Sequence, residues 1–118
     1  MNDFELYLKE INFTQEQLKD WMTYMDKYYY IETLSNIYYK SKSPINGWGL
    51  FAVDNIKKDN VIGKASIKDK RTTLARFTNH SNDPNIFLKK VKEDVIGFAL
   101  KDINKNEELL VNYRHEGM

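Results

Sequence analysis

The chain has 118 residues, 42% of them hydrophobic and 14% aromatic, which predicts one globular domain and excludes a disordered chain. It contains no cysteine, so disulfides, thiolate nucleophiles and zinc-thiolate sites are excluded. Residues 1–35 carry a net charge of −4 and residues 36–118 one of +5, an excess too small to predict nucleic-acid binding.

The first residues, "MNDFELYLKE", lack the basic flank and apolar run of a signal peptide. No apolar stretch approaches the roughly 18 residues that a membrane span needs. We therefore expect a soluble, intracellular protein that does not contact membranes.

A helix is predicted to begin at Thr14. Thr14 and Gln17 have the spacing of a capping box, and Phe13 and Leu18 that of a hydrophobic staple. Apolar residues then recur at helical spacing on one face as far as about Leu34; they are Leu18, Trp21, Met22, Met25 and Tyr29. This face must be buried somewhere. A shorter helix is expected over residues 4–11, so that residues 1–35 form a helical arm.

From residue 36 onward the pattern is typical of a small β-rich domain. Short runs rich in Ile, Val, Phe and Tyr alternate with polar turns. The expected strands are "NIYYKSKS", "GLFAVDNI" and its partner "VIGKASI", then a hairpin over "NIFLKKVKEDVIGFALKDI" that reverses near Glu93 and Asp94. "NKNEELLVNY" adds a turn and a last apolar segment. We expect residues 36–118 to form this second part, and the fold class to be α+β and mainly β.

Three segments of this β-rich part carry recognisable motifs. They are "NGWGLFAVDNIKKDN", "RFTNHSNDPN" and "VIGFALKDINKNEELLVNY". Together they resemble the SET domain, the fold of protein lysine methyltransferases that use S-adenosylmethionine, and the resemblance covers Asn36 to Arg114. It implies the β-clip architecture of small sheets with a threaded C-terminal segment, here preceded by the helical arm.

The resemblance also implies a set of cofactor-binding residues. Glycines without a Cβ allow the main chain to approach a ligand closely, and an asparagine can both donate and accept hydrogen bonds. By resemblance the cofactor contacts are Gly47, Trp48, Gly49, Phe77, Asn79 and His80. We expect His80 to act through its main chain and its packing rather than as a general base, and we expect no metal.

Tyr113 is the expected catalytic residue. A phenol near the transferred methyl group can orient it, and nearby carbonyls can offer it weak C–H···O contacts. A substrate lysine must lose its proton before it attacks, and entry into a dry channel lowers an ammonium pKa. Alignment of amine, methyl group and sulfur would then supply most of the remaining acceleration.

The departures from the family pattern lie on the substrate side. Only "KDKRTTLA" stands where the family usually has a Tyr-x-Gly-like segment and a helical insert, and no cysteine-bearing segment follows Tyr113. Another wall must then close the lysine channel, and we expect it from the arm, through Tyr28–Tyr30 or Tyr38–Tyr39, or from a second subunit. Asn106 stands in place of a glycine, which asparagine tolerates in a left-handed turn.

The sequence thus predicts a protein-lysine N-methyltransferase whose cofactor is S-adenosylmethionine and whose partner is a protein or peptide with an accessible lysine. The small size resembles stand-alone SET proteins of viruses, phages and bacteria, which would place the protein in a host cytoplasm if it is viral. Two alternatives remain open at this point: a SET-fold binding or structural protein without turnover, and a helical adaptor whose arm grips a basic partner.

Overall fold

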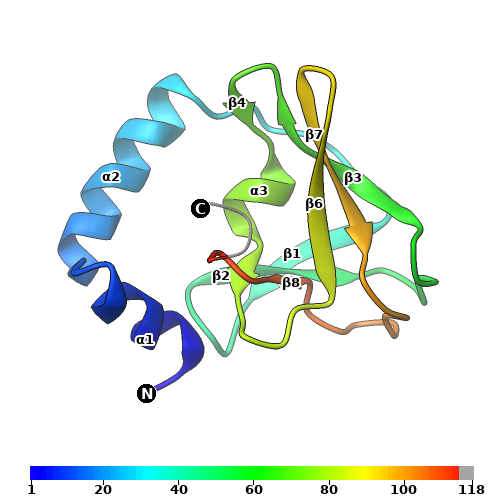
Figure 1. The fold of residues 1–118 in the computed structure, drawn as a ribbon, viewed down its shortest axis with the longest axis horizontal. Helices are drawn as coiled ribbons and strands as arrows, with labels where there is room; N and C mark the ends of the chain where they lie inside the picture. Colours follow the sequence, from blue (N-terminus) through cyan, green and yellow to red (C-terminus); the bar gives the residue numbers. More distant parts are fainter. Residues whose placement is uncertain (115–118) are drawn as a thin grey trace.

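The computed structural model describes residues 1–114 of the chain. Two helices, α1 (Asp3–Glu10) and α2 (Gln15–Tyr28), lie to one side of a β-rich body in Figure 1. No helix in the described part of the chain is long and apolar enough to cross a membrane. We refer to residues 1–35 as the arm and to residues 36–114 as the body.

The predicted start of α2 is confirmed in atomic detail. Thr14 Oγ1 accepts a hydrogen bond from the Gln17 N–H at 3.0 Å, and Gln17 Oε1 accepts one from the Thr14 N–H at 2.9 Å, so each satisfies a donor that the helix leaves free. The staple residues Phe13 and Leu18 belong to one apolar cluster. Thr14 is therefore the N-cap of the helix.

The predicted end of α2 near Leu34 is wrong, because the helix stops at Tyr28. Beyond it the chain pairs with the body instead: the Arg71 N–H donates to the Tyr29 carbonyl at 2.7 Å, and the Ile31 N–H donates to the Arg71 carbonyl at 2.8 Å. Hydrogen bonds to the body thus replace the helical ones that residues 29–34 would have formed.

The strands form three small sheets (Figure 1). Their bounds are β1 Tyr38–Lys42, β2 Trp48–Ala52, β3 Val61–Ile67, β4 Lys70–Arg71, β5 Asn79–His80, β6 Ile86–Val91, β7 Asp94–Ala99 and β8 Leu110–Val111. β1 pairs antiparallel with β2, a four-stranded antiparallel sheet has the order β4-β3-β7-β6, and β5 pairs parallel with β8. The predicted α+β, mainly β architecture is confirmed.

One predicted strand pairing is wrong. β3, the "VIGKASI" segment, was expected beside β2, but it pairs with β7, some 30 residues further along the chain, and with the short β4. β2 pairs with β1 over five residue pairs. The predicted hairpin is correct: β6 and β7 are joined at Lys92 and Glu93, and Lys92 has a positive φ of 59°.

The segment between β3 and β5 contains two elements that the sequence analysis did not predict. They are β4 and a short helix, α3 (Thr73–Phe77). α3 begins after Thr72, and its Leu74 side chain is fully buried in the body. This helix places Ala75, Arg76 and Phe77 on the side of the body that faces the arm.

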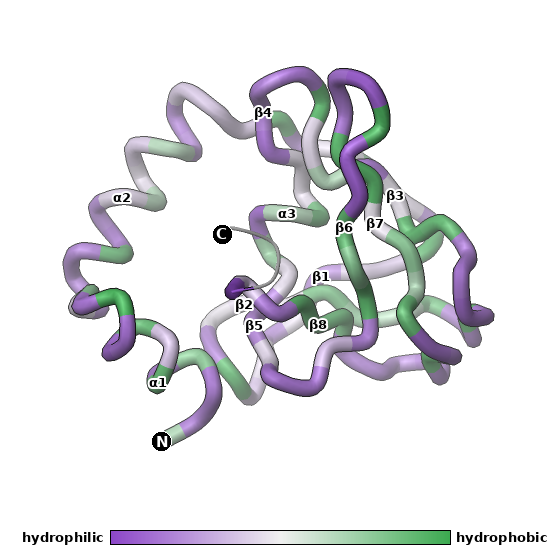
Figure 2. Tube along the Cα trace, in the orientation of Figure 1, coloured by the Kyte–Doolittle hydropathy of each residue, from purple (hydrophilic) through white to green (hydrophobic). Residues whose placement is uncertain are grey.

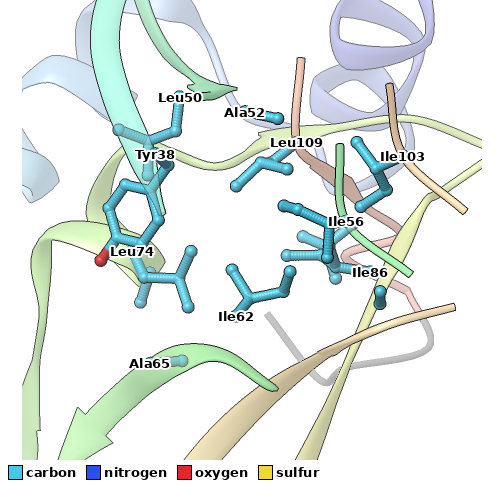
Figure 3. Packing of buried hydrophobic residues seen from close by; sticks show 13 residues of the cluster. Tyr38, Leu50, Ala52, Ile56, Ile62, Ala65, Leu74, Ile86, Ile103 and Leu109 are labelled. Carbon is cyan, nitrogen blue, oxygen red and sulfur yellow. The ribbon is translucent and has the colours of Figure 1, made fainter. Parts of the chain in front are cut away.

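The core of the body is built from the inward faces of the small sheets and α3. Figure 3 shows most of its aliphatic side chains meeting around Ile56 and Ile62, and no residue of the arm belongs to this cluster. Hydrophilic residues gather in the turns between strands, whereas much of β6 and β8 is hydrophobic (Figure 2). Burial of these apolar faces supplies the main driving force for folding of the body.

The C-terminal segment passes between two other parts of the body. On one side the Leu109 N–H donates to the Leu50 carbonyl of β2 at 2.8 Å, and on the other side β8 pairs with β5. Asn85 closes the crossing, since its side chain donates to the Glu108 carbonyl at 2.8 Å and accepts from the Leu110 N–H at 2.8 Å. This threading brings Tyr113 to the arm-facing side.

Candidate functional site

Asn79 joins the three motif segments at a single point. Its Nδ2 lies 3.2 Å from the Asn46 carbonyl, 3.3 Å from the Trp48 carbonyl and 2.9 Å from Glu108 Oε2. The Glu108 carboxylate also accepts from Ser43 Oγ, at 2.8 and 3.0 Å. Hydrogen bonds to a charged partner are stronger than neutral ones, so this carboxylate fixes the three segments relative to one another.

Glycine is needed at the two positions of the first motif for different structural reasons. Gly47 adopts a positive φ of 47°, which favours glycine, and a Cβ there would meet nothing within 4 Å. A Cβ on Gly49 would instead overlap the Glu108 carboxylate and lie 3.1 Å from Ser43 Cβ. Gly49 therefore makes room for the Glu108 side chain, and Gly47 allows the turn.

Trp48 and Phe77 lie near each other around one cation. The Trp48 side chain is half exposed, and Lys40 Nζ stands 5.5 Å from its ring centre and 4.4 Å from that of Phe77. Arg76 stacks on Phe77 at 4.7 Å. Aromatic faces attract cations at such distances, so this pair of rings forms a cation-binding surface of the body.

His80 is fully buried, and each ring nitrogen has a close polar neighbour. Its Nδ1 accepts a hydrogen bond from the Tyr113 N–H at 3.0 Å, and its Nε2 lies 3.2 Å from Arg114 Nη1. The ring packs against those of Tyr7 and Tyr113, at 5.0 and 5.1 Å. Burial, and then the Arg114 charge, hold the His80 pKa below its usual value.

This environment supports the structural interpretation of His80. A neutral ring whose Nδ1 lone pair already accepts a backbone N–H has no free basic nitrogen directed at a substrate. The ring instead fixes the main chain at Tyr113.

The Tyr113 phenol donates a hydrogen bond to the Thr78 carbonyl at 2.8 Å. Burial raises the pKa of the phenol far above its ordinary value, although the charges of Arg71 and Arg76 oppose the shift. Tyr113 is therefore a protonated donor and not a base. The phenol and a main-chain carbonyl stand together, which is the pair that the sequence analysis expected near a transferred methyl group.

Tyr113 lines a cavity of about 350 Å³ between the arm and the body. The arm supplies nine of the lining residues, among them Tyr7, whose ring meets that of Tyr113 edge-on at 5.4 Å. The polar side chains of the lining besides the two tyrosines are Arg71 and Arg76. Ligand pockets commonly have such a volume, a mostly apolar wall and a few polar groups.

An open groove of about 360 Å³ continues from this cavity toward the first motif. It shares Leu18, Met22 and Arg76 with the cavity and reaches Asn46, the neighbour of Gly47. The predicted cofactor residues themselves gather around Asn79 and behind Tyr113, and none of them lines the cavity. The structure thus brings the predicted residues together, and the cavity and the groove lie next to them.

The tyrosines that were expected to provide a wall do not line the cavity. The arm does reach Tyr113, but through Tyr7 rather than through Tyr28–Tyr30 or Tyr38–Tyr39. Tyr38 is buried in the core of the body, and Tyr39 stacks on Phe51 and donates to Asn106. Nothing in the sequence around Tyr7 distinguishes it from an ordinary helical tyrosine.

An ion pair between Arg114 and Glu10 joins the arm to the body beside His80. Arg114 Nε and Nη2 donate to the two oxygens of Glu10 at 2.7 and 2.8 Å, and the Asn82 N–H donates to Asp3 Oδ2 at 2.9 Å. α1 therefore covers the loop that follows β5. Sequence reasoning missed these contacts because the partners are about 80 to 100 residues apart.

The fold and the motif geometry define a class, that of SET-domain proteins, and comparison with known proteins agrees. Residues 64–114 match the family described as the SET domain. These residues thus match the SET domain that the motifs predict. Its arm lies outside the matched residues.

Named relatives are much longer proteins. A Neurospora crassa protein named histone-lysine N-methyltransferase, H3 lysine-4 specific, is 29% identical over 115 aligned positions, which cover 64% of this chain and 9% of that protein. The Emericella nidulans protein of the same name is 38% identical over 79 positions, covering 64% of this chain and 6% of that protein. This chain therefore spans less than a tenth of either relative.

Solved structures share the fold. A chain of ctPRC2, in an autoinhibited conformation bound to S-adenosylmethionine, superposes with a TM-score of 0.60 at 21% identity, over 70% of this chain and 16% of that chain. A chain of an active polycomb repressive complex 2 in the basal state gives a TM-score of 0.55 at 26% identity, over 64% of this chain and 15% of that chain.

Proposed function

We propose that this protein transfers a methyl group from S-adenosylmethionine to the ε-amine of a lysine in a protein or peptide. The observation that carries the proposal is the Tyr113 phenol, held at 2.8 Å by the Thr78 carbonyl and lining a cavity adjacent to the Asn79 junction. Names of the relatives make the N-terminal region of histone H3 one candidate substrate.

The residues present fit such a cofactor. The cavity and the groove together have room for a nucleoside with an amino-acid side arm, and aromatic and thioether side chains line much of the interior. Arg71 places buried guanidinium nitrogens without hydrogen-bond partners at the wall, which suits a negatively charged group. The proposed contacts at Gly47, Trp48, Gly49, Phe77, Asn79 and His80 do not line the cavity or the groove. Asn46 and Arg76, the chain neighbours of Gly47 and Phe77, line the groove.

The cofactor, when bound, supplies an electrophilic methyl group on a sulfonium. A neutral lysine nitrogen would take this methyl group, sulfur would keep the electrons of the carbon–sulfur bond, and the methylated amine would then lose a proton. Tyr113 and the Thr78 carbonyl orient the reacting carbon and nitrogen. An ammonium entering a dry cavity beside the Arg71 and Arg76 charges has a lowered pKa, which favours the neutral amine.

The second candidate is a SET-fold binding protein without turnover. One observation favours it: α1 covers His80 and the loop after it, and side chains of both arm helices line the cavity at Tyr113, which restricts the access of a peptide. Both functions predict cofactor binding, and only the first predicts methylated lysine.

The test combines calorimetry with mass spectrometry. S-adenosylmethionine is titrated into the protein, and lysine-containing peptides, including one from the H3 N-terminus, are then analysed for methyl transfer. Tyr113→Phe should lower transfer about 100-fold, because the reacting groups lose alignment, while cofactor affinity changes little. Tyr39→Phe, which removes a hydroxyl bonded to Asn106, is the matched control and should retain transfer.

Binding without methylated product in the wild-type protein would favour the second candidate. Absence of cofactor binding would refute the methyltransferase proposal, and unchanged transfer by Tyr113→Phe would refute the role of that residue.

A further inference from the structure

Arg71 is fixed in place by main-chain contacts on both sides. It ends β4 and pairs with Ser66 of β3, and its N–H and carbonyl are bonded to Tyr29 and Ile31 of the arm, at 2.7 and 2.8 Å. The side chain extends to the wall of the cavity. Because Nε and Nη2 are covered, a rotation of the side chain, without motion of the backbone, would bring them to a ligand there.

The guanidinium has fewer partners than its burial demands. Its Nε and Nη2 are inaccessible to water and make no hydrogen bond. The neighbouring carboxylate oxygen, Asp26 Oδ1, stands 3.7 Å from Nη2, beyond hydrogen-bonding distance, and is already engaged by Arg76 Nε at 2.7 Å. The two arginines therefore share one carboxylate, and unsatisfied buried donors of a charged group carry a large free-energy cost.

Other contacts hold the guanidinium plane without using its hydrogen-bonding edge. Arg71 stacks on the Trp21 ring, with 5.1 Å from its central carbon to the ring centre. Burial, and then the Arg76 charge, lower its pKa from the usual value, although an arginine stays protonated. A stacked, charged, buried guanidinium with free N–H groups is a binding site for a planar anion, and a carboxylate is the one that its fork geometry matches.

We infer that Arg71 binds the carboxylate of the methyl donor at the cavity wall. The inference rests on the proposed function, and it adds a ligand contact that lies outside the three motif segments. The groove that leads from Asn46 past Arg76 into the cavity gives the amino-acid arm of the ligand a path to Arg71. Asp26, which lines the groove, keeps the Arg76 charge compensated.

The test compares two ligands that differ only in this carboxylate, S-adenosylhomocysteine and its decarboxylated analogue S-adenosyl-3-thiopropylamine. Their affinities are measured by calorimetry for the wild-type full chain. A hydrogen bond to a charged group raises affinity by about 10- to 100-fold. The wild-type protein should therefore prefer S-adenosylhomocysteine by about this factor.

Arg71→Met should reduce this preference to less than about threefold, because it keeps an apolar chain against Trp21 and removes the donors. Lys70→Met removes a charge from the same strand at an exposed position that does not line the cavity, and it should keep the wild-type preference. Arg71→Lys keeps the charge and loses the fork, so an intermediate preference is expected. Thermal unfolding establishes that each variant is folded.

A full preference retained in Arg71→Met would overturn the inference and leave the proposed function standing. If that variant does not fold, an unchanged preference in Arg71→Lys would overturn it equally. Failure of both nucleosides to bind the wild-type protein would overturn the inference and the proposed function together.

Discussion

The Glu108 carboxylate accepts hydrogen bonds from Ser43 and Asn79, and it occupies the space that a side chain at position 49 would need. Its far end could swing away from a new Cβ only by giving up those bonds. The glycine of the first motif and the glutamate of the third are thus one structural unit, although 59 positions separate them.

Gly49→Ala should therefore destabilise the protein by about 1–3 kcal/mol, the range for overpacking, and should cost markedly less in a Glu108→Ala background. Urea unfolding of the four proteins in this double-mutant cycle gives the coupling. Gly47→Ala is the matched control: it is strained by its positive φ and has no neighbour within 4 Å, so its cost should be the same in both backgrounds. Additive costs for Gly49→Ala would show that Glu108 does not impose the glycine.

His80 makes stability depend on pH, because burial and Arg114 lower its pKa in the folded protein. The unfolded chain, with a histidine pKa of about 6.5, then binds more protons than the folded one at lower pH. The free energy of unfolding should stay level above about pH 7.5 and fall as the pH drops through 6.5, with a slope of at most about 1.4 kcal/mol per pH unit for one proton.

Urea unfolding between pH 7.5 and 5.5 measures this effect. His80→Asn removes the titrating ring and keeps an acceptor for the Tyr113 N–H, so its stability should change less over this interval. His115, which lies outside the described residues, is controlled by His115→Asn. Equal pH dependence in the wild-type and His80→Asn proteins would contradict the assignment.

At the scale of elements, local signals in the sequence were reliable and distant pairings were not. The Thr14 capping box and the β6–β7 hairpin depend on residues within a few positions of each other, and both were predicted. The left-handed turn at Asn106 was likewise anticipated. The partner of β3 and the stop of α2 at Tyr28 depend on β7 and Arg71, far along the chain, and both were missed.

The candidate site likewise has a part that local sequence patterns predict and a part that depends on distant contacts. Its motif residues could be predicted because their spacing within each segment is a family pattern, and the threaded C-terminal segment brings them to Asn79. The cavity could not be predicted, because it depends on how two helices pack on the body. Tyr7 and Arg71 carry no local signal, and their position becomes meaningful only when both reach the cavity with Tyr113.

At the scale of the whole molecule, the arm and the body have separate cores. The arm is anchored by a small cluster around Phe4, Leu8 and Leu18 and by ion pairs such as Glu10–Arg114. Exposed ion pairs contribute little, so the cluster carries most of the attachment. Because the main core contains no arm residue, we expect the body to keep its structure when α1 and α2 are removed.

A chain that begins at Tyr29 tests the importance of the arm for the cavity. It retains the pairing of Tyr29 to Ile31 with Arg71 and loses the nine arm residues that line the cavity. Circular dichroism should show a folded β-rich body, whereas affinity for S-adenosylmethionine should fall at least about tenfold, because the apolar wall is replaced by water.

The control for this truncation is Leu34→Ser in the full chain, a change at a side chain that is 97% exposed, and it should leave affinity unchanged. If the truncated chain does not fold, Phe4→Ser with Leu8→Ser in the full chain loosens the arm instead and should weaken binding in the same direction. Unchanged affinity in a folded chain without α1 and α2 would mean that the ligand binds elsewhere on the body. The Asn79 junction and the exposed Trp48 face would then be the place to look, because both are formed by the body alone.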